Sequence, residues 1–139
     1  MVEKMLVRRK LNKMIEYIEQ LKEVNKYTLD DYLDNFFIKR TSERLVQLIV
    51  EVAIDINGHI IVDEGYSPPE DYYNSFLKLS ETGVISGKFA KELAPSAGLR
   101  KRLLYEYEEI DDEIVYKSIK KAIENYSKYI KEIEEYLEE

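Results

Sequence analysis

The apolar residues of this chain recur at spacings of three and four over nearly its whole length, which is the period of an α-helix. Residues 3–24 predict a first helix. Residues 29–62 predict a second, either continuous or broken around 39–42, whose apolar residues cover two sides. A helix that is apolar on two sides is usually central in a bundle. The apolar stripes consist of Leu11, Met14, Ile15, Ile18 and Leu21 in the first helix, and of Leu45, Leu48, Ile49, Val52, Ile56 and Ile60, with Val46, Val50, Ile54 and Ile61, in the second.

The second half of the chain predicts shorter helices and then a long one. Residues 63–69 predict a loop, in which Ser67 and Glu70 have the spacing of a capping box. Short helices rich in aromatic residues follow. Gly83 is a suitable helix stop, and Pro95 interrupts or restarts the helical pattern.

A further helix is predicted from residue 98 to about 108, and a long final helix follows from Asp111. The final stripe consists of Val115, Ile119, Ala122, Ile123, Tyr126, Ile130, Ile133 and Leu137. No alternating pattern typical of strands competes with the helical one. The sequence therefore predicts an all-α fold, an antiparallel bundle of four or five helices, in a single domain spanning residues 1–139.

Composition narrows the class of protein. The 139 residues are 45% apolar and 35% charged, which is typical of a globular domain. The absence of cysteine excludes disulfides and thiolate zinc sites. No uninterrupted apolar run approaches the roughly 18 residues of a membrane span, and residues 1–10 lack the apolar region of a signal peptide. We therefore expect a cytoplasmic protein without a membrane segment.

Charge is unevenly distributed along the chain. The net charge of −7 argues against broad, nonspecific binding of nucleic acid. Residues 88–108 nevertheless carry five cations against three anions, whereas residues 111–139 carry nine anions against five cations. A local cationic patch on an acidic protein can still hold a phosphate.

The cationic segment contains the most distinctive chemistry of the chain. Arg100, Lys101 and Arg102 are consecutive, and tyrosines follow at 105 and 107. Arginine suits phosphate because its planar fork donates two parallel hydrogen bonds. A tyrosine, with a reference pKa near 10, does not readily act as a base at neutral pH, but it can donate a hydrogen bond, stack, or accept a modification. By spacing alone, the segment could equally be a solvated cationic turn with ordinary bundle aromatics.

On an ideal helix, Arg100 and Tyr105 differ by roughly 140° in direction, whereas Arg100 and Tyr107 differ by only about 20°. A site that uses both Arg100 and Tyr105 therefore requires a helix end, a distortion, or a second copy of the helix. A symmetric dimer supplies such a copy.

The segment 98–112 resembles the signature of the HEPN domain (higher eukaryotes and prokaryotes nucleotide-binding), in particular of its HepT-like toxin branch. That family has an arginine, then four to six residues, then a histidine, with a tyrosine two residues later in HepT and an acidic stretch that opens the last helix. Arg100 matches the arginine and Tyr107 the tyrosine. Tyr105 stands at the position of the histidine, and Lys101 at a position that is often asparagine.

The resemblance extends to Glu43-Arg44, to the segment 55–59 and to the Pro68-Pro69 loop, and so covers most of the chain. It implies an all-α homodimer, usually encoded beside a small nucleotidyltransferase antitoxin. Active members of the family are metal-independent RNases. Their arginine binds the scissile phosphate, their histidine serves in acid–base catalysis, and their tyrosine accepts AMP from the partner enzyme.

The resemblance thus implies roles for individual residues. Arg100 and Tyr105 are the candidate catalytic residues, and Arg100, Lys101 and Arg102 are the candidate phosphate contacts for single-stranded RNA. Tyr107 is the candidate AMP acceptor, and no cofactor or metal is expected. Cleavage is expected to be weakened by the tyrosine at 105. The alternatives are a catalytically inactive binding partner or AMP acceptor of a nucleotidyltransferase, and a structural bundle without nucleotide chemistry.

Two further features of the sequence suggest sites. His59, the single histidine, follows Glu51 and Asp55 at four-residue spacing, which could present ligands to a metal but is more often a polar stripe. His59 could also replace the missing base if the fold places it near Arg100. Tyrosines on more than one face of the final helix suggest an oligomer interface. They are Tyr116, Tyr126, Tyr129 and Tyr136.

Overall fold

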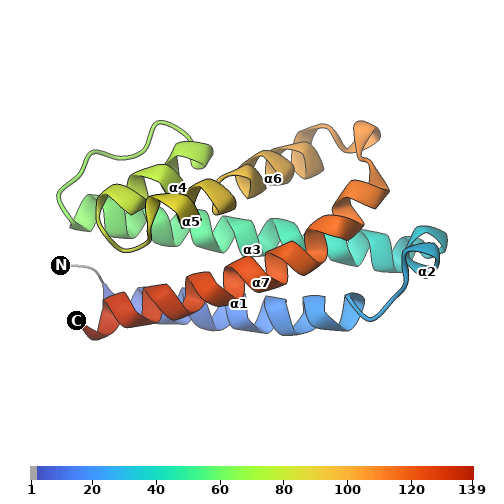
Figure 1. Cartoon of the computed structure of the whole chain (residues 1–139), viewed down its shortest axis with the longest axis horizontal. Coiled ribbons are helices and arrows are strands. Elements are labelled where there is room, and N and C mark those ends of the chain that lie inside the picture. Colours follow the sequence, from blue (N-terminus) through green and yellow to red (C-terminus); the bar gives the residue numbers. More distant parts are fainter. Residues whose placement is uncertain (1–2) are drawn as a thin grey trace.

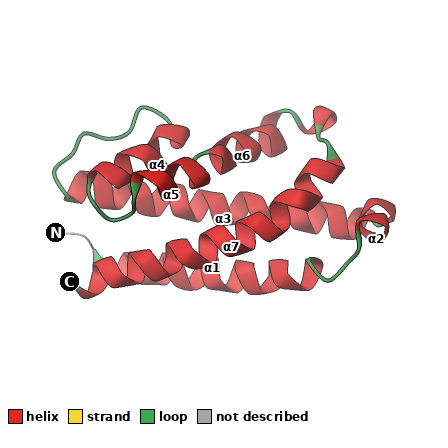
Figure 2. Cartoon of the chain, in the orientation of Figure 1, coloured by secondary structure: helices red, strands yellow, loops and turns green. Residues whose placement is uncertain are grey.

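The computed structural model describes residues 3–139, which form helices joined by turns, without a strand in that range (Figure 2). The all-α class expected from the sequence is confirmed. The elements are α1 (Lys4–Val24), α2 (Leu29–Asp34), α3 (Phe36–Asp63), α4 (Tyr72–Glu81), α5 (Gly87–Leu93), α6 (Pro95–Tyr105), the 3-10 turn η1 (Tyr107–Glu109) and α7 (Asp112–Glu138).

Helix α3 lies at the centre of the bundle (Figure 1). Helices α1 and α7 pack against each other and against one side of α3, while α4 and α6 pack on its other side, and α5 joins these two. The short helix α2 lies at the opposite end of the bundle from the start of α1 and the end of α7 (Figure 1). The central position follows from the two apolar sides that the sequence gives to this helix.

Most residues of the predicted stripes form the core or pack against it, but Ile15 of α1 is exposed and Leu48 of α3 is only partly buried. Tyr129 of α7, outside the predicted stripe, is fully buried. The largest buried side chains are Tyr32, Tyr126, Tyr129, Phe76, Phe89, Met14, Leu21, Ile49, Ile56, Ile60, Ile61 and Leu79.

Neither alternative for residues 29–62, a continuous helix or a break around 39–42, is correct, because the chain breaks at Asn35 instead. Asn35 has an extended backbone (φ −123°, ψ 101°), and its side-chain oxygen accepts a hydrogen bond from the Ile38 amide. An asparagine in this conformation supplies the partner that a first helical turn lacks. Helix α3 therefore starts at Phe36 and runs unbroken past residues 39–42 to Asp63.

The capping box predicted at Ser67 is also wrong. Helix α4 starts three residues after Pro69, and Asp71 is its cap, with a carboxylate oxygen 2.7 Å from the Asn74 amide nitrogen. Gly83, by contrast, has φ +87° immediately after the α4 cap, as expected for a helix stop. Pro95 occupies the first turn of α6, so it restarts the helix rather than only interrupting it.

The helix that carries the cations ends earlier than predicted. Its last residue is Tyr105, because Glu106 leaves the helical region (φ −129°, ψ 33°) and Tyr107 begins the separate turn η1. The small angle between Arg100 and Tyr107 expected on one ideal helix therefore does not apply. The final helix is capped as expected by Asp111, whose carboxylate accepts from the Glu113 and Ile114 amides.

The tyrosines of α7 do not form an exposed interface, so that argument for an oligomer is wrong. Tyr126 and Tyr129 are buried within the protomer, with ring centroids 5.7 Å apart. The rings of Tyr116 and Tyr32 are tilted against each other with centroids 5.1 Å apart. The Tyr116 hydroxyl donates to a backbone oxygen, and that of Tyr136 donates to a carboxylate. Their hydroxyl groups are used in packing helices together.

Helix α3 is long and apolar enough to span a membrane by length and composition alone, although it contains no uninterrupted apolar run of that length. The most apolar 18 residues of α3 have a mean hydropathy of 1.7, even though Glu51 and Asp55 interrupt the apolar run. Since 56% of that segment is buried inside the bundle, the same composition also fits the core helix of a helical domain.

Candidate functional site

The guanidinium of Arg100 is held between three helices. Arg100 projects from α6 toward α3, where its Nη2 donates to Oε1 of Glu51 at 3.1 Å. The ring centroid of Tyr72, from α4, lies 5.0 Å from the guanidinium carbon. The Arg100 side chain is only 14% exposed and that of Glu51 32%. The arginine predicted to bind phosphate is therefore the anchored member of a charged cluster.

Glu51 is itself fixed from its own helix. Gln47, one turn earlier on α3 and buried, donates its side-chain Nε2 to the same Oε1 at 3.2 Å. Sequence reasoning considered Glu51 only as a metal ligand and missed Gln47 and Tyr72 entirely. The available signal was the pair of polar residues at four-residue spacing on an otherwise apolar central helix, since a buried polar group needs a partner.

This arrangement prepares Arg100 to bind an anion. An arginine that is already immobilised loses less side-chain entropy on binding than a free one, and its planar fork matches a phosphate. Its Nε is buried, and within residues 3–139 no hydrogen-bond acceptor reaches it. An unpaired buried donor costs free energy, so holding Arg100 in this position lowers the stability of the fold.

The other residues of the predicted site are not gathered around Arg100 in the protomer. Lys101 and Arg102 are exposed, and Arg102 lines a groove of about 190 Å³ among α3, α5, α6 and α7. Tyr105 is 74% exposed at the end of α6, and Tyr107 is 66% exposed in η1. The two tyrosines share a hollow with the carboxylates of residues 106, 108 and 109.

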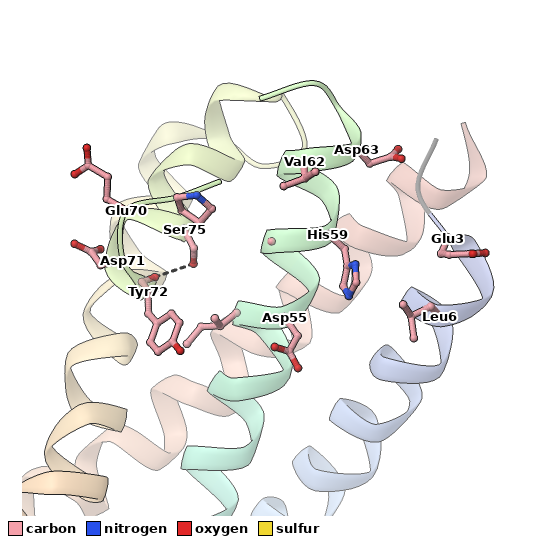
Figure 3. Close-up of a pocket in the computed structure, with 13 residues that line it drawn as sticks. Glu3, Leu6, Asp55, His59, Val62, Asp63, Glu70, Asp71, Tyr72 and Ser75 are labelled. Carbon is pink, nitrogen blue, oxygen red and sulfur yellow. Dashed lines mark hydrogen bonds between the residues drawn. The ribbon is translucent and has the colours of Figure 1, made fainter. Parts of the chain in front are cut away.

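His59 lies away from the arginine. It follows Glu51 by eight residues on α3, a rise of about 12 Å along the helix axis. Figure 3 shows Asp55 and His59 on one face of α3, with Tyr72 of α4 on one side and Leu6 of α1 on the other. The fold therefore does not bring His59 into the cluster, and it does not replace the missing base there.

The cavity in Figure 3 has a volume of about 680 Å³. Its carboxylate side chains come from Glu3, Asp55, Asp63, Glu70 and Asp71. Asp55 pairs with Lys10 at 3.4 Å. Among residues 3–139 no three histidine, aspartate or glutamate side chains are close enough together to hold a metal, so the metal alternative for His59 has no support. The negative charge of this cavity also disfavours a phosphate inside it.

Comparison with known proteins identifies the family. The sequence model of the family described as ribonuclease HepT-like matches residues 14–133. The chain belongs to the HepT-like ribonuclease family. The identification from the residues around Arg100, as a HEPN-type protein of the HepT-like toxin branch, is thereby confirmed.

Individual proteins resemble this chain in sequence or in fold. The tRNA nuclease HepT of Aphanizomenon flos-aquae is 35% identical over 136 residues, covering 98% of this chain and 92% of that protein. The tri-AMPylated HEPN toxin of Shewanella oneidensis, solved in complex with the MNT antitoxin, superposes with a TM-score of 0.85 at 21% identity, covering 96% and 98% of the two chains. The cytosolic protein YutE of Bacillus subtilis superposes with a TM-score of 0.80 at 25% identity, covering 99% and 92%.

Proposed function

We propose that this HepT-like protein is the toxin component of a toxin–antitoxin pair and cleaves RNA without a metal, with Arg100 binding the scissile phosphate. The observation that carries the proposal is the anchored guanidinium, fixed by Glu51 and Tyr72 before any ligand arrives. Preorganised cations of this kind stabilise the charge that develops in phosphoryl transfer. The family and the relative named as a tRNA nuclease support RNA as the substrate.

Lys101 and Arg102 extend the cationic surface beyond Arg100. Both are exposed, so they suit the flanking phosphates of a single strand rather than the reacting one. Tyr105 takes the position of the family histidine and contributes as a hydrogen-bond donor rather than a base, which weakens cleavage.

Tyr107 is the proposed AMP acceptor. It is 66% exposed in a turn at the end of α6, so a second enzyme can reach its hydroxyl group. The S. oneidensis toxin, which shares this fold, is AMPylated and bound to an MNT antitoxin. The proposed partner of this chain is therefore a nucleotidyltransferase antitoxin that transfers AMP to Tyr107 and so regulates the nuclease. We place both proteins in the cytoplasm.

The proposed assembly is a homodimer through the face that carries α6. The homodimer is supported by the fact that Arg100 and Tyr105 do not meet within one protomer. Arg100 faces α3, whereas Tyr105 is exposed at the end of the same helix. A second copy would bring its own Tyr105 toward the first Arg100. Sedimentation equilibrium should give twice the mass of the chain, and a monomer at all concentrations would contradict this assembly.

A second function rests on Tyr105 specifically. A protein that lacks the family's acid–base residue could retain the fold and the acceptor tyrosine and serve only as binding partner or AMP acceptor of the nucleotidyltransferase. The two functions are separated by assaying cleavage and AMP transfer independently.

The test incubates purified protein with labelled single-stranded RNA in EDTA, beside Arg100→Ala and Tyr105→His variants. We expect cleavage by the native protein, a loss of about 100-fold or more in Arg100→Ala, and a gain in Tyr105→His. In parallel, transfer of labelled AMP by the partner enzyme should be lost in Tyr107→Phe. Transfer without cleavage by the native protein would favour the second function, and neither activity would contradict both.

A further inference from the structure

The reaction assigned to this chain lacks a base at the position where the family carries one. Tyr105 does not readily accept a proton at neutral pH and lies exposed at the end of α6. We propose that Glu51 is the general base of the cleavage reaction. This inference rests on the proposed nuclease function and names the residue that activates the nucleophile.

The position of Glu51 beside Arg100 carries the argument. Its Oε1 lies 3.1 Å from the Arg100 Nη2. A phosphate bound to the part of the guanidinium that does not face Glu51 is therefore separated from the carboxylate only by the guanidinium itself. In RNA the nucleophile of metal-independent cleavage is the 2′-hydroxyl group next to that phosphate. A base must come within hydrogen-bond reach of the proton that it removes, and Glu51 is the carboxylate placed to do so.

The carboxylate is also suited to this role. The hydrogen bonds described at Glu51, from Arg100 and from Gln47, both end on Oε1, so neither donor occupies Oε2. About a third of the Glu51 side chain remains exposed (32%), so a ribose hydroxyl group can reach it. Arg100 is more buried than Glu51, as expected if the arginine is the fixed element and the carboxylate faces the substrate.

In the proposed step Glu51 takes the proton of the 2′-hydroxyl group as the 2′-oxygen attacks phosphorus. The bond between phosphorus and the 5′-oxygen breaks, and the 5′-oxygen takes a proton from water. The products are a 2′,3′-cyclic phosphate and a 5′-hydroxyl end. Glu51 then returns its proton to the resulting hydroxide, which restores both the carboxylate and the water.

The charged and titratable groups around Glu51 come from each packed element. Arg100 on α6 pairs with Glu51 and packs on the ring of Tyr72 from α4. Gln47 lies one turn before Glu51, and Asp55 lies one turn after it, already paired with Lys10 of α1. The competing reading is that Glu51 only positions Arg100. A glutamine at this place can still accept from the guanidinium but cannot accept a proton, so it separates the two roles.

The test measures single-turnover cleavage of labelled RNA by the native chain, Glu51→Gln, Glu51→Asp and Gln47→Leu, in EDTA and from acid to neutral pH. We expect Glu51→Gln to cleave at least about 100-fold more slowly and to lose the acid limb of the pH–rate profile. Glu51→Asp should retain that limb at a reduced rate. Gln47→Leu removes the other hydrogen bond on Oε1 without removing the base, so its profile should keep its shape.

Three outcomes would overturn the proposal. Cleavage by Glu51→Gln within about threefold of the native rate would exclude Glu51 from the chemistry. A slower Glu51→Gln that keeps the acid limb would reduce Glu51 to a positioning residue for Arg100. If the native protein shows no cleavage that depends on Arg100, the nuclease function itself fails and the base assignment fails with it, whereas in the first two cases the nuclease function stands.

Discussion

The buried polar chain behind the site predicts a specific loss of stability in Tyr129→Phe. The Tyr129 hydroxyl lies 2.6 Å from the side-chain oxygen of Asn57 and 3.2 Å from the Ala53 carbonyl. Asn57 in turn donates to Ser75, which donates to the backbone of Tyr72. This chain links α7 through α3 to α4, the helix that carries the ring packed on Arg100.

The size of the stability loss follows from the buried polar group that the substitution leaves without a hydrogen-bond donor. Tyr129 and Asn57 are fully buried, so removal of the hydroxyl group takes the donor from the Asn57 oxygen in a place that water does not reach. An unsatisfied buried polar group costs about 1–3 kcal/mol, and we expect a free energy of unfolding lower by about 2 kcal/mol. With about 2.1 cal/mol/K of unfolding entropy per residue, this corresponds to a fall in Tm of about 7 °C for a chain of this length.

Tyr126→Phe is the matched control. Tyr126 is equally buried, and its hydroxyl lies 2.6 Å from that of Ser96. Ser96 retains its bond to the Leu93 carbonyl when Tyr126 loses its oxygen, so this variant should cost only about 1 kcal/mol. Urea unfolding followed by circular dichroism measures both. A Tyr129→Phe variant as stable as the native chain, or more stable than Tyr126→Phe, would refute the reasoning.

Three further predictions concern the scaffold. Asp71→Ala removes the α4 cap and should lower the free energy of unfolding by about 1 kcal/mol, whereas an unchanged urea midpoint would show that this cap contributes nothing. Gly83→Ala places a side chain at φ +87° with no atom within 4 Å, so backbone strain alone should cost about 1 kcal/mol, and a Tm equal to the native value would contradict this. Burial, then the Glu43 charge, raises the pKa of Tyr32 from 10.0 to about 12. Because the folded state keeps this proton longer than the unfolded state, the contribution of Tyr32 to stability should be constant below about pH 10 and fall toward pH 12, and a Tyr32→Phe variant should show a smaller fall in that range.

The fold could be predicted from the sequence because its determinants are periodic and local. The two apolar sides of residues 45–61 specify a central helix, and Pro95 and Asp111 specify where helices start. The predicted helix boundaries were wrong where two nearby residues could each start or cap a helix. Asn35, rather than the residues around 40, broke the second helix, and Asp71, rather than Ser67, capped the fourth, because each choice depends on how the flanking helices pack.

Only part of the candidate site could be predicted from the sequence in this way. Arg100 stood out by residue type and by its neighbours, but Glu51 and Tyr72 come from elements far from it in sequence. The contact of these two residues with Arg100 depends on how the helices pack, so it cannot be predicted from residue spacing in the sequence. Tyr107 was placed on the wrong kind of element for a related reason, since the end of α6 at Tyr105 depends on the backbone of Glu106.

The most direct test of the account compares RNA cleavage by the native chain and by Arg100→Ala in EDTA, with Lys120→Ala as a control that removes one exposed cation from α7. We expect cleavage by the native protein, near-native cleavage by Lys120→Ala, and a loss of about 100-fold or more in Arg100→Ala. Equal rates for the native protein and Arg100→Ala would contradict the claim that the anchored arginine is the centre of a metal-independent ribonuclease site.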